Sequence, residues 1–189
     1  MQRPVVLTVA GGSASGKSTF AQRLAQSLDG LSVRVMNMDR YFRKEKPVAV
    51  GPLSGRQWPD YNQPDSFHLD QLLSDLDQAQ EEVVIVEGLM ALWSEPLRER
   101  SDLKLFVDAS ADERIVRRLR RNMAERGLSF DEIADYYLDS VRFRHNEFVE
   151  PTRWQADLVI NGTRLSEQAI EAVACWTRAA VKSRREETG

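Results

Sequence analysis

Short apolar runs alternate with longer amphipathic stretches along most of the chain. The runs, rich in valine, leucine and isoleucine, occupy residues 5–10, 33–36, 83–86, 103–107 and 158–160. Each run is too short for a helix, and several lack polar alternation, which is typical of strands that are covered on both faces. We therefore predict five buried β-strands.

Helical periodicity fills the intervals between these runs. Phe20, Leu24 and Leu28, for example, fall on one stripe of a helix. Two Ser-x-x-Glu sequences, at 110–113 and 129–132, predict capping boxes at the starts of two later helices. The predicted helices cover 17–28, 69–76, a stretch from 110, a stretch from 129 to just before Pro151, and about 166–182, followed by a frayed charged tail at 184–187.

Strand–helix alternation predicts a parallel sheet with helices on both faces, here a three-layer α/β/α sandwich with five parallel strands. One interval breaks the alternation. Residues 39–64 lack a clear strand or helix signal and contain four prolines together with Trp58 and Tyr61. Structureless segments of this length are usually functional or disordered, and the aromatic residues favour a substrate-binding loop.

Composition limits the class of protein. The length of 189 residues suits a single domain over 1–189, and a formal net charge of −3 argues against a dedicated nucleic-acid binder. Cys175 is the one cysteine, which excludes an internal disulfide and a four-cysteine zinc site and fits a reducing compartment. The apolar run near the start is too short for a secretion signal or a membrane span. We expect a cytoplasmic protein without membrane or nucleic-acid partners.

Residues 11–18 read Gly-Gly-Ser-Ala-Ser-Gly-Lys-Ser and satisfy G-x-x-x-x-G-K-[ST] in full. The sequence follows a predicted strand and opens a predicted helix, the context that distinguishes a P-loop from a chance match. In such a loop backbone N–H groups bind phosphate, Lys17 reaches the β- and γ-phosphates, and the Ser18 hydroxyl ligates Mg²⁺. The expected nucleotide-binding residues are Gly11, Gly12, Ser13, Ala14, Ser15, Gly16, Lys17, Ser18 and Thr19.

Two carboxylates follow predicted strands. Glu87 ends the strand at 83–86, and strand ends of one parallel sheet face the same crevice, so it is a candidate to hold Mg²⁺ directly or through water. Asp39 ends the second strand, where a carboxylate can orient an alcohol and take its proton. An aspartate in this position is, on its own, more often a turn former.

Six arginines, at positions 114, 117, 118, 120, 121 and 126, crowd one predicted helix and its exit. At 3.6 residues per turn, four of them (114, 117, 118 and 121) share a face. Three interpretations stay open: a solvated helix face, an RNA-binding patch, or a lid over about 111–128 whose arginines close over phosphates.

These segments occur in the order typical of the uridine kinase branch of the P-loop kinases, which also includes phosphoribulokinase-like relatives. The resemblance runs from Val5 to about Gly162, and the segments that carry it are AGGSASGKST, MDRYFRK, QPDSF, VIVEGLMAL, LFVDASADERIVRRLRRNMAERG and FVEPTRWQADLVING. It implies a P-loop NTPase-type fold with a helical lid, ATP and Mg²⁺ as cofactors, and Asp39 as the catalytic base.

The departures from the family pattern cluster in the parts that frame the base. Uridine kinases usually carry a β-hairpin with Tyr-Asp-Phe after the second helix, whereas residues 80–82 alone separate that helix from the next strand here. Leu128 replaces an arginine, and Asn62 and His68 replace aspartates. A site that loses a base-reading group loses discrimination, so another set of residues reads the acceptor or the acceptor differs.

Replacement contacts are available in the long loop and after the lid. Trp58 and Tyr61 can stack on a heterocycle. Asp65 keeps the family's Pro-Asp pair, and His145 lies on the helix after the lid, where core packing is at least as common a role. The expected substrate-binding residues are Asp39, Tyr41, Trp58, Tyr61, Asp65 and His145.

We predict an ATP- and Mg²⁺-dependent kinase of a small metabolite, with the 5′-OH of uridine or cytidine as the first candidate acceptor. A nicotinamide riboside-like nucleoside, a sugar phosphate and pantothenate are the alternatives. A GTPase-type switch lacks its Asn-Lys-x-Asp and Asp-x-x-Gly motifs, and a regulatory or RNA-binding protein with a nucleotide pocket is the remaining rival. The resemblance leaves a homo-oligomer open. The expected catalytic residues are Asp39, Lys17, Arg117, Arg121 and Arg126, and the expected metal ligands are Ser18 and Glu87.

Overall fold

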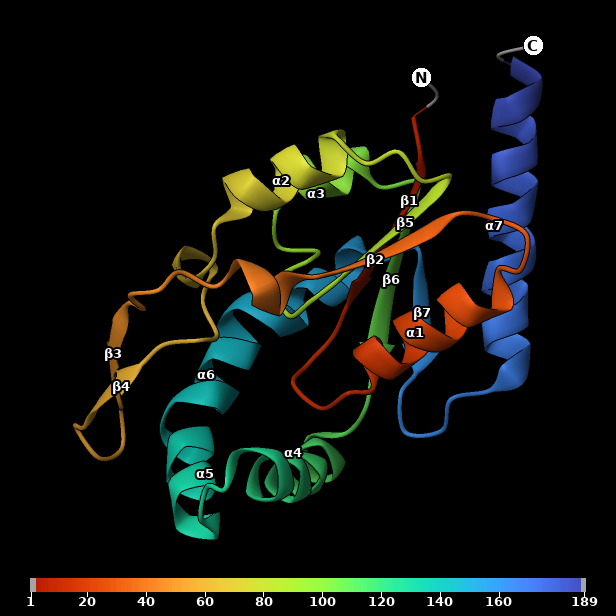
Figure 1. Ribbon diagram of the computed structural model, residues 1–189. Helices are drawn as coiled ribbons and strands as arrows, with labels where there is room; N and C mark the ends of the chain where they lie inside the picture. Colours follow the sequence, from red (N-terminus) through yellow and green to blue (C-terminus); the bar gives the residue numbers. More distant parts are fainter. Residues whose placement is uncertain (1–2, 188–189) are drawn as a thin grey trace.

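A five-stranded parallel sheet forms the centre of the molecule (Figure 1). The computed structural model describes residues 3–187, so the ends of the domain predicted over 1–189 lie outside the described residues. The strand order is β2–β5–β1–β6–β7. The strands are β1 (Val5–Ala10), β2 (Val33–Asn37), β5 (Val83–Glu87), β6 (Leu103–Asp108) and β7 (Leu158–Asn161). All five predicted strands are confirmed to within one residue at each end.

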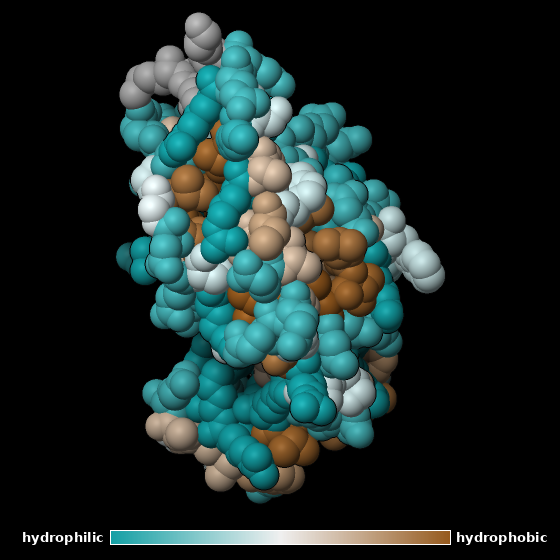
Figure 2. Space-filling view, turned by 90° about the vertical axis from the view of Figure 1, so that its right-hand side faces the viewer, coloured by the Kyte–Doolittle hydropathy of each residue, from teal (hydrophilic) through white to brown (hydrophobic). Residues whose placement is uncertain are grey.

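Helices cover both faces of the sheet, which confirms the three-layer α/β/α sandwich. The α-helices of the described chain are α1 (Lys17–Ser27), α2 (Leu69–Asp77), α3 (Glu95–Arg100), α4 (Ala111–Arg126), α5 (Phe130–Tyr136), α6 (Arg142–Arg144) and α7 (Glu167–Glu187). α1 and α7 lie on one face, while α2 and α3 cover the other (Figure 1). The face that bears α7 is mainly hydrophilic, with apolar residues showing in patches between charged ones (Figure 2).

The alternation of side chains along β1 divides the core in two. Leu7 and Val9 pack with Leu24 of α1 on one face, whereas Val6 and Ala10 point into the cluster on the other face. This is the two-residue period of a strand, with both faces buried. A continuous apolar run therefore serves two cores at once.

The interval predicted as a structureless loop contains a small antiparallel hairpin, β3 (Val48–Val50) and β4 (Gln57–Pro59). Short 3₁₀ turns flank it, η1 (Met38–Tyr41) and η2 (Pro64–Ser66). Strands of three residues, one ending in a proline, fall below the length at which alternation gives a signal. No strand lies between α2 and β5, so the base-framing hairpin of uridine kinases is absent from this part of the described chain.

The helix after the lid is longer and less regular than predicted. It continues from α5 through the π-helical turn η3 (Tyr137–Val141), α6 and a second π turn, η4 (His145–Val149), to the 3₁₀ segment η5 (Glu150–Gln155). Ser129 and Glu132 form the predicted capping box. The box predicted at Ser110 is wrong, because the Ser110 side chain makes no cap hydrogen bond to α4.

The frayed tail predicted at 184–187 is helical instead. α7 continues to Glu187 because Arg184 pairs with Asp102 and Arg185 pairs with Glu82, so both charges are held against the body of the protein. The short helix α3 gave no periodic signal; it starts with Pro96 in its first turn, a position that proline favours.

Leu24→Ala tests the packing of α1 between the sheet and α7. Leu24 is fully buried in the core, so we expect the substitution to lower the free energy of unfolding by about 2–5 kcal/mol. Urea denaturation measures the change. Gln26→Ala, at an exposed position of the same helix, is the control and should change stability by less than about 0.5 kcal/mol.

Candidate active site

The P-loop adopts a strained backbone between β1 and α1. Gly11 and Gly16 have φ of 148° and 99°, and Ala14 is in the left-handed region at 64°. Left-handed non-glycine residues are uncommon and concentrate at functional sites. Gly16 gives α1 no side-chain cap, so the first N–H groups of the helix are free to bind an anion.

Two other segments pack closely against the P-loop: the helix α4 and the loop after β7. A Cβ atom on Gly12 would overlap the guanidinium of Arg114, and one on Gly162 would overlap the carbonyl oxygen of Ser15. Arg118 donates from Nη1 to Ser13 Oγ at 2.7 Å. Because Arg114 and Arg118 are buried, the interpretation of the arginine helix as a solvated face is wrong for both residues.

Ser18 and Glu87 lie together at the ends of adjacent elements. Ser18 Oγ donates to Glu87 Oε1 at 3.0 Å, and Glu87 is only 3% exposed. Burial raises the pKa of Glu87, while the nearby Lys17 charge and the Ser18 hydrogen bond lower it. A hydroxyl and a buried carboxylate suit a hard cation such as Mg²⁺, which takes its other oxygen ligands from phosphate and water. The described residues contain no group of three histidine, cysteine or carboxylate side chains arranged to hold a metal.

Two cavities adjoin the P-loop. The first has a volume of about 630 Å³ and lies between the P-loop, the hairpin and the helices α4 and α5. The second has a volume of about 860 Å³ and lies along the P-loop, α1 and the loop after β7. The residues that line both cavities are Lys17, Ser18, Asp39, Arg121 and Arg126. The two spaces therefore meet at the side chains predicted to act on a phosphoryl group.

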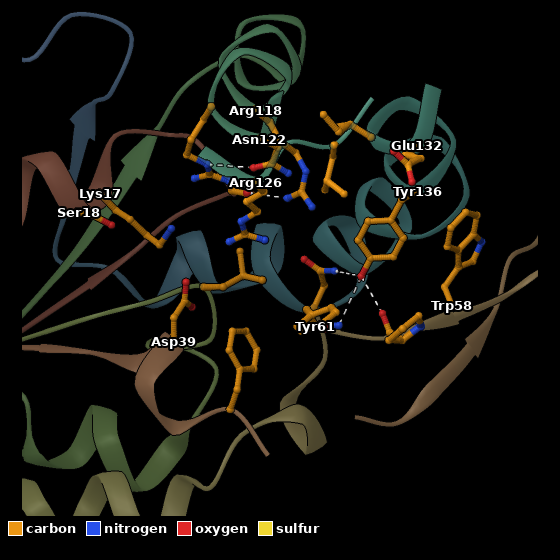
Figure 3. Close-up of a pocket in the computed structure, with 18 residues that line it drawn as sticks. Lys17, Ser18, Asp39, Trp58, Tyr61, Arg118, Asn122, Arg126, Glu132 and Tyr136 are labelled. Carbon is orange, nitrogen blue, oxygen red and sulfur yellow. Dashed lines mark hydrogen bonds between the residues drawn. The ribbon is translucent and has the colours of Figure 1, made fainter. Parts of the chain in front are cut away.

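The first cavity has a charged end and an aromatic end. Figure 3 shows Lys17 and Asp39 on one side and Trp58 and Tyr136 on the opposite side, with Arg126 projecting between them. The Trp58 and Tyr136 rings are 5.4 Å apart at 52°. Such a space suits a ligand with a planar ring at one end and a reacting group at the other.

Tyr136 forms hydrogen bonds with two residues at the aromatic end of the first cavity. Its hydroxyl donates to the carbonyl oxygen of Pro59 at 3.0 Å and accepts from Nδ2 of Asn62 at 3.0 Å. Because the tyrosine proton is already committed, Asn62 must offer its NH₂ group to the hydroxyl. Asn62 therefore keeps its carbonyl oxygen as the free group of its amide. Burial raises the pKa of Tyr136, so the hydroxyl stays protonated.

The arginines of α4 concentrate positive charge at the junction of the two cavities. Burial lowers the pKa of Arg118 to about 10, so the side chain stays charged at neutral pH. Burial and repulsion from Arg126 lower the pKa of Arg121, whose Nε donates to Asn122 Oδ1 at 3.2 Å. An anion bound among these groups would remove their mutual repulsion.

Most of the predicted site residues belong to the P-loop, line one of its two cavities or, like Glu87, bond to a residue that does. Arg117 lines only the second cavity and donates to the carbonyl oxygens of Gly162 and Thr163 at 2.9 and 3.0 Å. Tyr41, Asp65 and His145 line neither cavity.

Tyr41 donates to Asp75 Oδ2 at 2.7 Å, and burial together with this carboxylate raises its pKa to about 12. Asp65 is exposed on η2. His145 is buried in η4, with Nε2 3.2 Å from a carboxylate oxygen of Glu150. The structure gives these three side chains other partners or solvent exposure, so their substrate contacts stay predictions.

Several residues that line the first cavity were not among the predicted site residues. Asn122 lies one turn after Arg118, and Ile133 and Tyr136 lie one turn apart on α5, so each pair shares a helix face. That spacing is the signal that could have grouped them. Phe42 and Leu89 follow strand ends and gave no comparable signal.

A P-loop beside two strand-end carboxylates, with an arginine helix over the phosphate side, defines a P-loop kinase. The chain belongs to the phosphoribulokinase / uridine kinase family, whose profile matches residues 66–171. A uridine kinase of Deinococcus deserti is 37% identical over 205 residues, covering 95% of this chain and 98% of the relative. A uridine kinase of Chloroflexus aggregans is 35% identical over 206 residues, with coverage of 95% and 97%. Both compared stretches exceed 189 residues, so the relatives carry residues that this chain lacks.

Solved structures share the fold. A kinase ascribed to a fructose transport system of Silicibacter sp. TM1040 superposes with a TM-score of 0.63 at 18% identity, covering 84% of this chain and 90% of the other. A shikimate kinase of Bacteroides thetaiotaomicron gives 0.54 at 20% identity, with coverage of 94% and 98%. Family membership favours the kinase over the RNA-binding interpretation of the arginine helix. Among helices of the described chain, none is long and apolar enough to cross a membrane.

The acid dependence of stability tests the position of His145. Burial and the neighbouring Arg114 charge lower its pKa to about 4, whereas the unfolded chain binds the proton near pH 6.5. The neutral histidine therefore stabilises the fold above pH 6.5, and this contribution is lost as the pH falls toward 4. Between pH 7 and pH 5 the wild type should lose about 2 kcal/mol more than His145→Gln.

Urea denaturation at the two pH values measures this difference. The same variant should leave the KM of both substrates unchanged, because His145 lines neither cavity. A higher KM for the acceptor in His145→Gln than in the wild type would support the predicted contact between His145 and the acceptor.

Proposed function

We propose that this chain transfers the γ-phosphoryl group of ATP to the 5′-hydroxyl of a pyrimidine nucleoside, uridine or cytidine. The observation that carries the proposal is the junction of the two cavities at Lys17, Ser18, Asp39, Arg121 and Arg126. A donor in one cavity and an acceptor in the other would meet at these side chains. Proximity of this kind supplies a large part of the rate enhancement in phosphoryl transfer.

The phosphate groups of ATP fit the P-loop side. Free N–H groups at the start of α1 and the ammonium of Lys17 supply donors and positive charge. When bound, Mg²⁺ offsets the negative charge of the phosphates, and Ser18 with Glu87 would hold it. Arg121 and Arg126 line the same junction. Their positive charge would stabilise the negative charge on the phosphoryl group during transfer.

Asp39 is the carboxylate at the junction. Asn37 Oδ1 accepts from the Asp39 backbone N–H at 2.7 Å and fixes the start of η1. The Asp39 side chain is exposed to both cavities, so it can accept a hydrogen bond from an alcohol on the acceptor side and take its proton during transfer. Closing the arginine helix over the junction would exclude water as a competing acceptor.

The opposite end of the first cavity suits a pyrimidine. Trp58 and Tyr61 supply faces for a planar ring. The amide of Asn62 keeps a carbonyl acceptor, and Asn122, whose oxygen is used by Arg121, keeps an NH₂ donor. Each of these amide groups can pair with a donor or an acceptor on a pyrimidine edge.

The similarity to relatives named uridine kinase supports a nucleoside acceptor over a sugar phosphate or pantothenate. We extend the proposal to a cytoplasmic role in pyrimidine salvage, since the product would be a nucleoside monophosphate. The loss of the family hairpin implies that the residues around Trp58 and Tyr136 have taken over the contacts to the base.

Asp39→Asn tests the assignment of the base. ADP release is followed with ATP and Mg²⁺ against uridine, cytidine, nicotinamide riboside, ribulose 5-phosphate and pantothenate. We expect turnover of uridine or cytidine, and a kcat at least about 100-fold lower in the variant with the KM for ATP little changed. Asp70→Asn, an exposed aspartate of α2, is the matched control and should behave as wild type.

Each other result has a definite meaning. Turnover of nicotinamide riboside, the sugar phosphate or pantothenate, without turnover of uridine or cytidine, would contradict the pyrimidine acceptor and leave the kinase activity in place. Full activity of Asp39→Asn on uridine would remove Asp39 from the chemistry.

A further inference from the structure

Residues 48–62 form an arm that projects from the sheet beside α5 and α6 (Figure 1). The arm consists of the β3–β4 hairpin and the turn that follows it. Its strands pair only with each other, so the sheet does not position it. Phe42 and Ser66 contact its base, and all its other side-chain contacts described below are to the helix at 130–149.

Asp139, in the π-helical turn η3, is the centre of these contacts. Oδ1 accepts from the backbone N–H groups of Leu53 and Ser54 at 2.9 and 3.2 Å. Oδ2 accepts from Trp58 Nε1 at 2.7 Å and from the Ser54 hydroxyl. The carboxylate is 3% exposed, and four donors of the arm converge on its two oxygens. Both oxygens are thus used as acceptors by one short segment of chain.

The turn of the hairpin is shaped around this carboxylate. A Cβ atom on Gly51 would overlap Oδ2 of Asp139, so the backbone approaches the side chain as closely as glycine allows. The Gly51 N–H donates to Arg56 O at 2.8 Å and closes the hairpin above it. π-helical turns are rare and concentrate at functional sites, which agrees with a specific role for η3.

The arm contributes to one cavity only. Trp58, Pro59, Tyr61 and Asn62 line the first cavity, and no residue of the arm lines the second. Asp139 itself lines neither cavity. Asp139 can therefore act on the acceptor only through its neighbours, which are the arm and its own helix with Tyr136.

We propose that Asp139 is a positioning residue that sets the affinity for the acceptor by holding the arm, and Trp58 in particular, against the first cavity. The inference rests on the proposed function, because it concerns the same acceptor. Hydrogen bonds from Ser54, and then from Trp58 and the two backbone N–H groups, hold the pKa of Asp139 well below its usual range against the effect of burial. The side chain is thus a charged acceptor throughout the working pH range.

Asp139→Asn tests the proposal directly. The amide places an NH₂ group where one oxygen accepted, so at least two donors of the arm lose their acceptor. We expect the KM for uridine to rise at least about 10-fold and the KM for ATP to stay within about 2-fold, since the second cavity is untouched. Asp135→Asn is the matched control, because Asp135 lies on the same helix and its ion pair with Arg56, at 3.2 Å, is exposed. It should change neither KM.

Gly51→Ala provides an independent variant away from both cavities. Its Cβ would push the turn from Asp139, so it should raise the acceptor KM and spare the KM for ATP in the same way. An unchanged acceptor KM in Asp139→Asn would overturn the proposal. Equal rises in both KM values with a lower Tm would also overturn it, since they would indicate a merely structural role.

Amide hydrogen exchange separates this inference from the proposed function. Exchange at Leu53 and Ser54 should be at least about 10-fold faster in Asp139→Asn than in Asp135→Asn, whichever acceptor the enzyme uses. If the wild type releases no ADP with nucleosides but the exchange rates of the two variants still differ, only the proposed acceptor is overturned. The KM values are then compared with the acceptor that the panel identifies. Equal exchange in the two variants would overturn the role of Asp139.

Discussion

The active site depends on a close approach of backbones around the P-loop. The carbonyl oxygen of Ser15 faces the loop after β7 at Gly162, and Gly11 packs against the carbonyl of Val107 at the end of β6. Neither contact leaves room for a side chain, so the P-loop is held from two strand ends while β1 and α1 hold it from within. This rigidity keeps the first N–H groups of α1 aimed at one point, as an electrostatically preorganised site requires.

The two halves of the site have different structural origins. Strand ends of the central sheet supply the phosphate half, with Glu87 at the end of β5 and the segment leading to Asp39 after β2. The acceptor half is built outside the sheet, by the arm and the helix at 130–149. Lid residues such as Arg121 connect the halves because α4 lies over both cavities.

The phosphate half could be predicted from the sequence, because its signals are local. Apolar runs of three to six residues mark the strands of the sheet, and the P-loop, Asp39 and Glu87 each follow one. The arm could not be predicted. Its strands have three residues each and are held by Asp139, which lies more than 80 residues away in the chain. Tyr41 points away from both cavities because its hydroxyl donates to Asp75, 34 residues along the chain, a contact that gives no local signal. Asp65 faces solvent, and His145 pairs with Glu150, five residues away.

The shape of the arm has a consequence for how such enzymes diverge. Its stability comes from a handful of polar contacts to one helix, and it shares no apolar cluster with the sheet apart from its base. Substitutions at its tip can therefore accumulate without eroding the global fold, which leaves acceptor preference free to drift. A phosphate-binding module of this kind can acquire new alcohol substrates by changes confined to one hairpin while its nucleotide chemistry stays fixed.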